Sequence, residues 1–416
     1  MGTGPDAASA APAHRVVGWR RAVQGLFVAA VLVVLAAPAV VQVAQRGEPR
    51  RAENRTPAAL PAAPTSLAGL PAWTAGVDAW LKDHFGLRNR LVDALDQIHF
   101  RVFGAFTSPQ IVMGREGRVF LASHVAGEEY RNSLILAGCG AGVAPAKLQA
   151  IAQSMATVLE RSDAAGAGRS LAVVAPSASA LYQAQLPPWL ERRCRGATPM
   201  ADGIVAAMPE PMRDRAASLR PLLAALDPAT PAIPRYNFHW DGDGPLHAAP
   251  WIAETLLGRR AAFALPTRME RKRSDITGFF PGVRLFAEVP QADEGKAGVA
   301  TCLGPPCFAA ELGAEVATRL EDLRRHRSPQ GEGRLLLLTD SFGAFVAAGF
   351  TPYFREVVQV SLNNLPYLSA GQRAQLRRAL FDQYRPDATV YLLHEFSANY
   401  YWDILLRDLL PPGDPR

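Results

Sequence analysis

The most informative stretch of this chain is Leu335-Leu-Leu-Leu-Thr-Asp340-Ser341-Phe-Gly343. Four consecutive leucines suit a strand that is buried on both faces of a parallel sheet. The polar residues that follow end the strand, and an apolar stretch of helical character comes next. We therefore expect the hydroxyl of Ser341 at the carboxyl edge of a sheet and at the start of a helix, where free backbone N–H groups stabilise negative charge.

Local sequence leaves two roles open for this turn. Asp340 and Ser341 are both common N-caps, so the pair could simply begin the helix. Alternatively, Ser341 is a nucleophile, and Gly343 lets the backbone pass close to a substrate oxygen. Gly343 and Tyr353 are candidate oxyanion or substrate contacts, although a packed or capping role is also open for Tyr353.

Other apolar runs predict the neighbours of this strand. Strands are expected at 171–175, 357–360 and 388–393, and helical periodicity is present at 147–160 and 372–384. Strands separated by helices indicate an α/β fold with a parallel sheet that is covered on both faces.

A second polar stretch, Arg235-Tyr-Asn237-Phe-His239-Trp-Asp241-Gly-Asp243, offers the base that a serine nucleophile needs. His239 is the candidate base, and its second ring nitrogen needs an orienting acceptor. Asn237, Asp241 and Asp243 are the candidates for that acceptor. A lone His in a polar loop is often structural. A catalytic role for His239 is therefore supported only if a nucleophile belongs to the same site.

The N-terminal part of the chain contains an apolar run. In Ala22–Val41 the only polar side chain is that of Gln24. This run spans about 30 Å as a helix, which is the thickness of the hydrocarbon core of a bilayer. An uncleaved anchor, a cleaved signal and a buried core helix are all open, and arginines on both sides leave the orientation open too. Either of the first two exports the remainder of the chain.

The net charge of +6 comes from 44 basic and 38 acidic side chains. The basic residues are scattered, and the densest runs, at 268–273 and 324–327, contain no aromatic residues. This pattern favours solvated faces and excludes nucleic acid as a partner.

The four cysteines fit an oxidising compartment. Cys302 and Cys307 close a short loop, which leaves Cys139 with Cys194 as the second pair, and four free buried thiols are the alternative. No C-x2-C pair, Walker A motif or dinucleotide fingerprint occurs, so we expect neither a metal nor a cofactor.

Several separated motifs, in a constant order, resemble the alginate O-acetyltransferases of the bacterial periplasm over about residues 53–400. In that family an Asp-x-His-Trp motif precedes a Gly-Asp-Ser motif. The other landmarks of the resemblance are Glu53-Asn54-Arg55 with Pro57 and Pro61, Phe85-Gly-Leu-Arg88, Val112-Met-Gly-Arg-Glu-Gly117-Arg-Val-Phe120, Pro176-Ser-Ala-Ser-Ala-Leu-Tyr182 with Leu186-Pro187, and Tyr384-Arg-Pro386-Asp387 before a strand that ends at Glu395.

The resemblance implies that Ser341 carries the acetyl group and that His239 is the general base. Asn237 stands where the family has Asp, and an amide orients imidazole without stabilising imidazolium by charge. Three outcomes are open: Asn237 suffices, Asp241 or Asp243 takes the place of the acceptor, or activity is reduced. Glu395 is either a site residue or a salt-bridged structural one.

For the fold, the resemblance implies a permuted SGNH-hydrolase-like parallel sheet with flanking helices, preceded by an N-terminal transmembrane helix. The expected segments are a cytoplasmic tail (1–21), a membrane anchor or signal (22–44), a linker (45–70), a helical lead-in and hairpin (71–130) and an SGNH-like catalytic domain (131–410).

For function, the resemblance implies transfer of acetyl groups to hydroxyls of an alginate-like exopolysaccharide. A membrane-bound O-acyltransferase would be the acetyl donor, and the chain would cross the inner membrane once with its main domain in the periplasm. The alternatives are a carbohydrate acetylesterase and a catalytically weakened subunit for polysaccharide binding or assembly.

Overall fold

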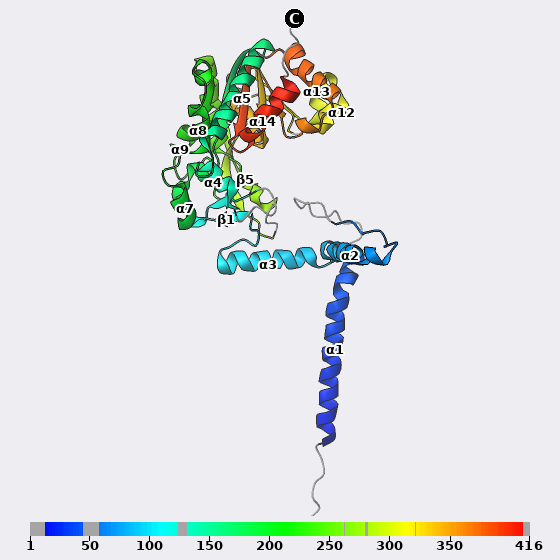
Figure 1. The fold of residues 1–416 in the computed structure, drawn as a ribbon. Coiled ribbons are helices and arrows are strands. Elements are labelled where there is room, and N and C mark those ends of the chain that lie inside the picture. The colour runs from blue at the N-terminus through cyan, green and yellow to red at the C-terminus, as the bar shows by residue number, and fades with distance from the viewer. Residues whose placement is uncertain are drawn as a thin grey trace, which may run out of the picture. The chain divides into compact units, whose positions relative to one another are not determined.

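A computed structural model describes residues 13–44, 58–123, 131–261, 263–278, 282–320 and 322–410 of the chain (Figure 1). The chain divides into two compact units, Met1–Ile98 and His99–Arg416. The first part of the expected cytoplasmic tail, linker residues 45–57 with the landmark at 53–57, and the end of the expected hairpin segment lie outside the described residues.

Figure 1 labels the helices and strands in chain order. The strands are β1 (Ile111–Met113), β2 (Val119–Leu121), β3 (Arg169–Ala175), β4 (Ala216–Ser218), β5 (Thr267–Arg273), β6 (Phe286–Ala292), β7 (Ala300–Leu303), β8 (Arg324–Arg327), β9 (Arg334–Thr339), β10 (Glu356–Ser361) and β11 (Ala388–His394). The helices are α1 (Ala13–Ala44), α2 (Leu70–His84), α3 (Arg88–Phe103), α4 (Ser133–Gly138), α5 (Pro145–Ala164), α6 (Ala178–Leu181), α7 (Pro188–Cys194), α8 (Met200–Ala206), α9 (Arg220–Ala224), α10 (Asp243–Leu257), α11 (Ala309–Leu312), α12 (Ala314–Arg319), α13 (Ala370–Arg377) and α14 (Tyr401–Ile404).

The described residues of the second unit form a seven-stranded sheet in the order β4-β3-β11-β9-β10-β8-β7. The contacts from β4 to β10 are parallel, and β8 and β7 add antiparallel pairs at one edge. The five parallel strands can be renumbered 1 to 5 as β9, β10, β11, β3 and β4, which treats β3 as the strand that follows β11. Their order across the sheet is then 2-1-3-4-5, which is the flavodoxin-like doubly wound order. The chain therefore enters this sheet at its fourth strand, and the expected permuted α/β fold is confirmed.

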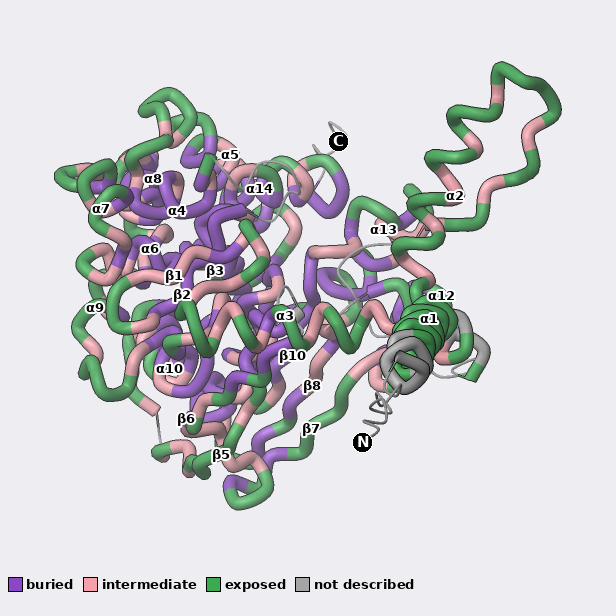
Figure 2. Tube along the Cα trace, turned by 90° about the horizontal axis from the view of Figure 1, so that it is seen from below, coloured by how far each residue is buried: buried purple, intermediate pink, exposed green. Residues whose placement is uncertain are grey.

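Alternation along the strands places a core on each face of the sheet. In β9, Leu335 and Leu337 belong to one hydrophobic cluster, and Leu336 and Leu338 belong to the other. Successive side chains of a strand point to opposite faces of the sheet. Alternate leucines of the run are therefore buried in the two hydrophobic cores on either side of the sheet. Figure 2 shows the central strands in the colour of buried residues, with exposed chain around them.

A buried arginine ties the β1–β2 hairpin to the segment before His239. Arg118 donates from Nη1 to the carbonyl of Ile233 at 2.9 Å, and its guanidinium lies 3.7 Å from the centre of the Tyr182 ring. The N–H of Val119 donates to the carbonyl of Arg235. The hairpin expected within 71–130 is present as β1 and β2, and it holds the loop that carries the candidate base.

The structure departs from expectation at three places. The basic runs 268–273 and 324–327 form the strands β5 and β8, which the sequence pattern did not predict. The side chains of β5, which pairs with β6 in a two-stranded arm, are mostly exposed, whereas β8 lies between β10 and β7 and is partly buried. The helix expected after Ser341 is two short 3-10 turns, Ser341–Phe345 and Ala347–Phe350. Two glycines and the following Pro352 disfavour a longer helix there.

Both expected disulfides are present, as Cys139–Cys194 and Cys302–Cys307. Within the described part of the chain, α1 alone is long and apolar enough to cross a membrane, over Arg21–Pro38.

Candidate active site

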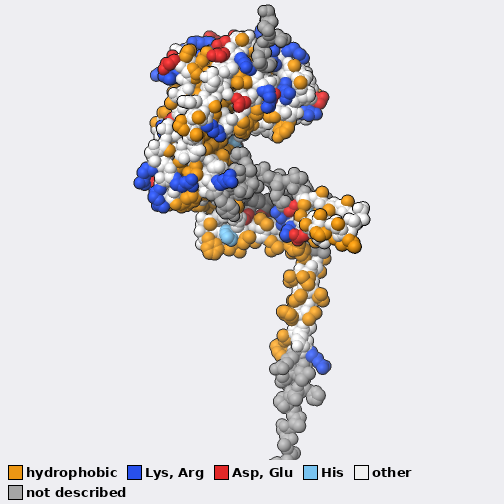
Figure 3. Space-filling model, in the orientation of Figure 1, with side chains coloured by type: hydrophobic (Ala, Val, Ile, Leu, Met, Phe, Trp, Pro, Cys, Tyr) orange, Lys and Arg blue, Asp and Glu red, His pale blue; other side chains and the backbone are white. Residues whose placement is uncertain are grey.

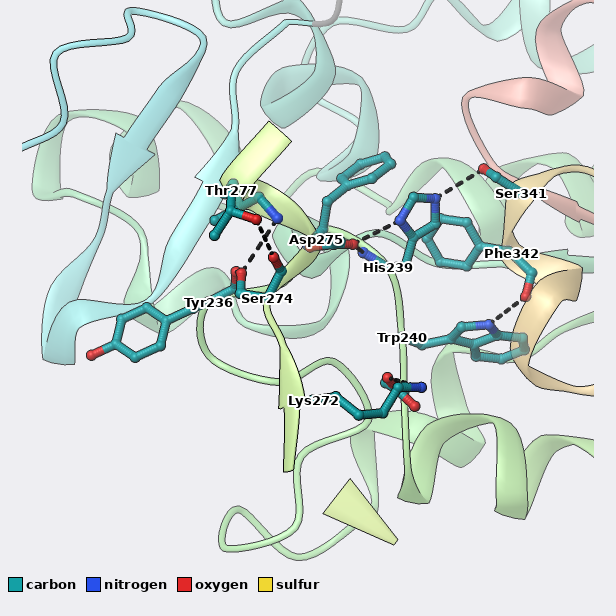
Figure 4. A network of polar contacts seen from close by, with 12 residues as sticks. Tyr236, His239, Trp240, Lys272, Ser274, Asp275, Thr277, Ser341 and Phe342 are labelled. Atoms are coloured by element: carbon teal, nitrogen blue, oxygen red, sulfur yellow. Dashed lines mark hydrogen bonds and ion pairs between the residues drawn. The ribbon is translucent and has the colours of Figure 1, made fainter. Parts of the chain in front are cut away.

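The two residues expected to react lie within hydrogen-bond distance of each other. The Nε2 atom of His239 is 2.9 Å from Oγ of Ser341, although 102 positions separate them in the chain (Figure 4). Ser341 follows β9 at the carboxyl edge of the sheet, and His239 lies in the loop that precedes α10. Both side chains therefore come from segments that the sheet and its covering helix hold in place.

The second ring nitrogen of His239 contacts a residue that no sequence motif indicated. Nδ1 lies 2.7 Å from Oδ2 of Asp275, which follows the end of β5. The same carboxylate accepts the backbone N–H groups of Phe238 and His239 at 2.9 and 2.8 Å. A carboxylate at Nδ1 keeps the proton there, so Nε2 of the neutral ring is free to accept the Ser341 proton.

The acceptors expected from the sequence lie elsewhere. Asn237 is buried, and its Oδ1 has no hydrogen-bond partner among the residues that the structure describes. Asp241 binds Nζ of Lys272 at 2.8 Å and Nε2 of Gln291 at 2.6 Å. Asp243 is the first residue of α10. The expectation that Asn237, Asp241 or Asp243 orients His239 is thus corrected, because Asp275 occupies that position.

No motif in the sequence points to Asp275, because no fixed spacing connects it to His239. It comes after a basic run that reads as a solvated surface, and only the β5–β6 arm brings it to the site. A neighbouring contact fastens it locally: the Ser274 hydroxyl donates to the carbonyl of Tyr236 (Figure 4). The feature of the sequence that could have indicated Asp275 is its place as a polar residue directly after a strand, β5.

The turn that carries Ser341 is fixed from three sides. The Asp340 carboxylate accepts the N–H of Phe342 at 2.9 Å and the N–H of His394 at 2.7 Å, and burial raises its pKa. The indole Nε1–H of Trp240 donates to the carbonyl of Phe342 at 2.7 Å. The capping role open to Asp340 therefore holds, and Ser341 is left to face His239.

Aromatic rings form an apolar wall beside the imidazole. The ring of Phe342 stacks on His394 with centroids 4.1 Å apart and lies 5.0 Å from the ring of His239. Burial, and then the nearness of His239, lower the pKa of His394 well below its usual value. His394 is therefore neutral at physiological pH and acts as part of the wall.

The two oxyanion candidates are engaged in other contacts. The N–H of Gly343 donates to the carbonyl of Asp340 at 3.1 Å. Tyr353 is buried, donates its hydroxyl to Glu254 at 2.9 Å, and has its pKa raised to about 12 chiefly by burial. Within the described residues, the backbone N–H of Ser341 itself has no hydrogen-bond partner.

Gly343 is nevertheless required by packing. A Cβ at this position would lie 2.0 Å from Oγ1 of Thr339, a side chain that is fully buried. Glycine lets the turn pass against the end of β9, so the close approach here is to Thr339 of the protein itself.

Glu395 holds two loops at the same edge of the sheet. Its Oε1 accepts the N–H of Ser177 at 2.8 Å and its Oε2 accepts the N–H of Ala201 at 3.0 Å. The side chain is fully buried, and this burial raises its pKa to about 7. Among the two roles left open for Glu395, the structure shows a structural one, with backbone amides in place of a salt bridge.

No group of three or more His, Cys, Asp or Glu side chains is placed to hold a metal ion within the described ranges.

No family model and no curated protein matches this chain. Several solved structures are similar. A DHHW family protein from Eubacterium siraeum has 13% identity and a TM-score of 0.45, over 73% of this chain and 97% of that one. The O-acetyltransferase domain of AlgJ from Pseudomonas putida has 15% identity and a TM-score of 0.41, over 70% and 92%. PatB1 from Bacillus cereus has 10% identity and a TM-score of 0.41, over 61% and 91%. These values describe a broad likeness of chain arrangement, and the chemistry of the site follows from its own geometry.

Proposed function

We propose that this chain is an SGNH-hydrolase-like O-acetyltransferase that acetylates hydroxyls of an exopolysaccharide in the periplasm. The observation that carries the proposal is the continuous hydrogen-bonded series Ser341, His239 and Asp275. A hydroxyl, an imidazole and a partly buried carboxylate in this order are the parts of a serine acyl-transfer site.

In the first half of the reaction, Nε2 of His239 removes the Ser341 proton while Oγ attacks the carbonyl carbon of the acetyl donor. Asp275 stabilises the imidazolium that forms. The bond from the carbonyl carbon to the leaving group of the donor then breaks, and the leaving group takes the proton from Nε2. The N–H of Ser341 is the proposed hydrogen-bond donor to the developing oxyanion. The products are acetyl-Ser341 and the protonated leaving group.

In the second half, Nε2 takes the proton of a sugar hydroxyl while that oxygen attacks the acetyl carbon. The bond from Oγ to the acetyl carbon breaks, the proton moves from Nε2 to Oγ, and the O-acetylated sugar leaves. Two disulfides and the apolar α1 support an exported, singly anchored chain in the inner membrane. A membrane-bound O-acyltransferase is the proposed donor, since acetyl-CoA is cytoplasmic.

A carbohydrate acetylesterase is the second candidate, because the same steps with water as the acceptor give hydrolysis. The partial exposure of the His239 side chain, 22%, favours access by an acceptor of either kind. The weakened-subunit alternative depended on Asn237 as the acceptor, and Asp275 removes that reason.

The test uses the purified full chain in detergent with p-nitrophenyl acetate. Product release that is lost in Ser341→Ala and kept in Ser154→Ala, on the surface of α5, supports the serine site. An inactive natural chain, or an active Ser341→Ala, overturns it. Mass spectrometry of an added oligosaccharide then separates the two candidates, because only a transferase increases its mass by acetyl groups.

A further inference from the structure

Helix α3 presents an apolar stripe to its surroundings. Its members are large hydrophobic side chains at intervals of three or four residues, with exposed fractions of 57% for Leu91, 50% for Leu95, 53% for Ile98 and 67% for Val102. This spacing places them on one side of the helix. Figure 3 shows hydrophobic side chains gathered along the lower edge of α3.

Another side of the same helix is packed. Phe100 contacts a hydrophobic cluster that includes Ile111, Val119 and Ile276. A helix that packs one side on a domain and faces water with the other carries polar residues on the outer side. The outer side of α3 carries leucine, isoleucine and valine where polar residues would be expected. We therefore expect this side of the helix to contact something other than water.

Basic side chains lie at the ends of the apolar stripe. Arg90 precedes Leu91 and Arg101 precedes Val102, and both arginines are exposed. Their long stems allow the guanidinium groups to reach past an apolar boundary to anionic headgroups. Phe103, which is 67% exposed, follows at the end of the stripe. Leucine, isoleucine and valine on one side of a helix, with arginine at the edge of that side, are typical of a helix in a membrane interface.

A second feature of the chain, the apolar helix α1, also indicates that a bilayer is near. The span-length helix α1 ends at Ala44, and α3 begins at Arg88 of the same chain. We propose that α3 lies in the plane of an anionic bilayer surface, with Leu91, Leu95, Ile98 and Val102 in the acyl-chain boundary. This second membrane contact is independent of the acetyltransferase proposal.

The test places an environment-sensitive nitrobenzoxadiazole label on α3 of the full chain in vesicles. All four native cysteines are in disulfides, so Leu95→Cys introduces the one free thiol for labelling. The vesicles contain phosphatidylglycerol and a lipid with a doxyl group high on its acyl chain. We expect blue-shifted emission from position 95 and a loss of most of that emission to the doxyl lipid.

The matched control is Gln153→Cys, an exposed position on α5, which we expect to give water-like and unquenched emission. Removing both charges in Arg90→Gln/Arg101→Gln should lower the quenching at position 95. Water-like emission from position 95 overturns the proposal. Blue-shifted emission that the doxyl lipid leaves unquenched also overturns it, because protein then covers the stripe. A chain that fails to float with the vesicles overturns it as well.

Discussion

Nδ1 of His239 lies 2.7 Å from Oδ2 of Asp275, across 36 positions of the chain. The carboxylate also accepts the two backbone N–H groups at Phe238 and His239. Asp275 therefore shapes the loop that carries His239, and it favours the tautomer with the proton on Nδ1, which the proposed base needs.

The first prediction concerns the orienting carboxylate. Asp275→Asn should lower kcat by about 10³- to 10⁴-fold with p-nitrophenyl acetate, because an amide at Nδ1 favours the wrong tautomer and leaves imidazolium without a counter-charge. The control is Asn237→Ala, which should keep kcat within about tenfold because its Oδ1 has no hydrogen-bond partner in the described chain. A larger loss in Asn237→Ala than in Asp275→Asn would contradict the assignment.

The second prediction concerns the ion pair between Asp241 and Lys272. The Asp241 side chain is 4% exposed and lies 2.8 Å from Nζ of Lys272, which is on the strand that leads to Asp275. Lys272→Met leaves this buried carboxylate without its counter-charge and should lower the free energy of unfolding by about 3 kcal/mol. Urea unfolding measures this loss, and kcat should fall with it because the arm that carries Asp275 loosens.

The matched control for this pair is Arg319→Gln, which breaks an exposed pair with Glu315. Exposed pairs contribute about 0–1 kcal/mol, so this variant should unfold almost as the natural chain does. Adding Asp241→Asn to Lys272→Met should recover part of the lost stability. Additive losses in the double variant would show that the two side chains do not interact.

The third prediction concerns pH and Glu395. Burial raises the pKa of Glu395 to about 7, so the folded state holds this proton more tightly than the unfolded chain does. The resulting stabilisation is complete below the unfolded pKa of about 4.3 and is lost as pH rises through about 7. The free energy of unfolding should fall over this range by up to about 3 kcal/mol from this group alone.

Urea titrations at a series of pH values measure how the free energy of unfolding changes with pH, that is, its slope against pH. Glu395→Gln should flatten it between pH 5 and pH 8, since an amide has no proton to lose in that range. An unchanged slope in this variant would assign the dependence to another group.

The fourth prediction concerns the two disulfides. Cys139–Cys194 joins positions 55 residues apart, and Cys302–Cys307 joins positions 5 residues apart. Loop-closure entropy gives about 4 kcal/mol for the long loop and about 2 kcal/mol for the short one. Replacing each pair by alanines should therefore lower Tm more for Cys139/Cys194. The reverse order of the two variants would show that local packing around the short loop dominates.

Strand prediction succeeded where the sheet is buried on both faces. The apolar runs inside β3, β9, β10 and β11 stand out because both faces of each strand must be hydrophobic. The arm strand β5 has the opposite character, since most of its side chains are exposed and charged. The expectation of a solvated face is confirmed for β5, but charged exposed residues carry no periodic signal, so the sequence does not predict that this run forms a strand.

The spacing of apolar runs and the positions of the cysteines predict the α/β class of the fold and the two disulfides, both of which the structure contains. Local sequence leaves a capping role for Ser341 and a structural role for His239 open, and the family resemblance makes the two residues candidates for a reaction. Which side chain faces Nδ1 of His239 depends on the folding of segments far apart in the chain. Asn237 and Asp241 were nearer in the chain, but a loop's side chains point where its backbone contacts and ion pairs direct them. The β5–β6 arm brings Asp275 to the imidazole, and Lys272 and Gln291 of that arm hold Asp241 away from it.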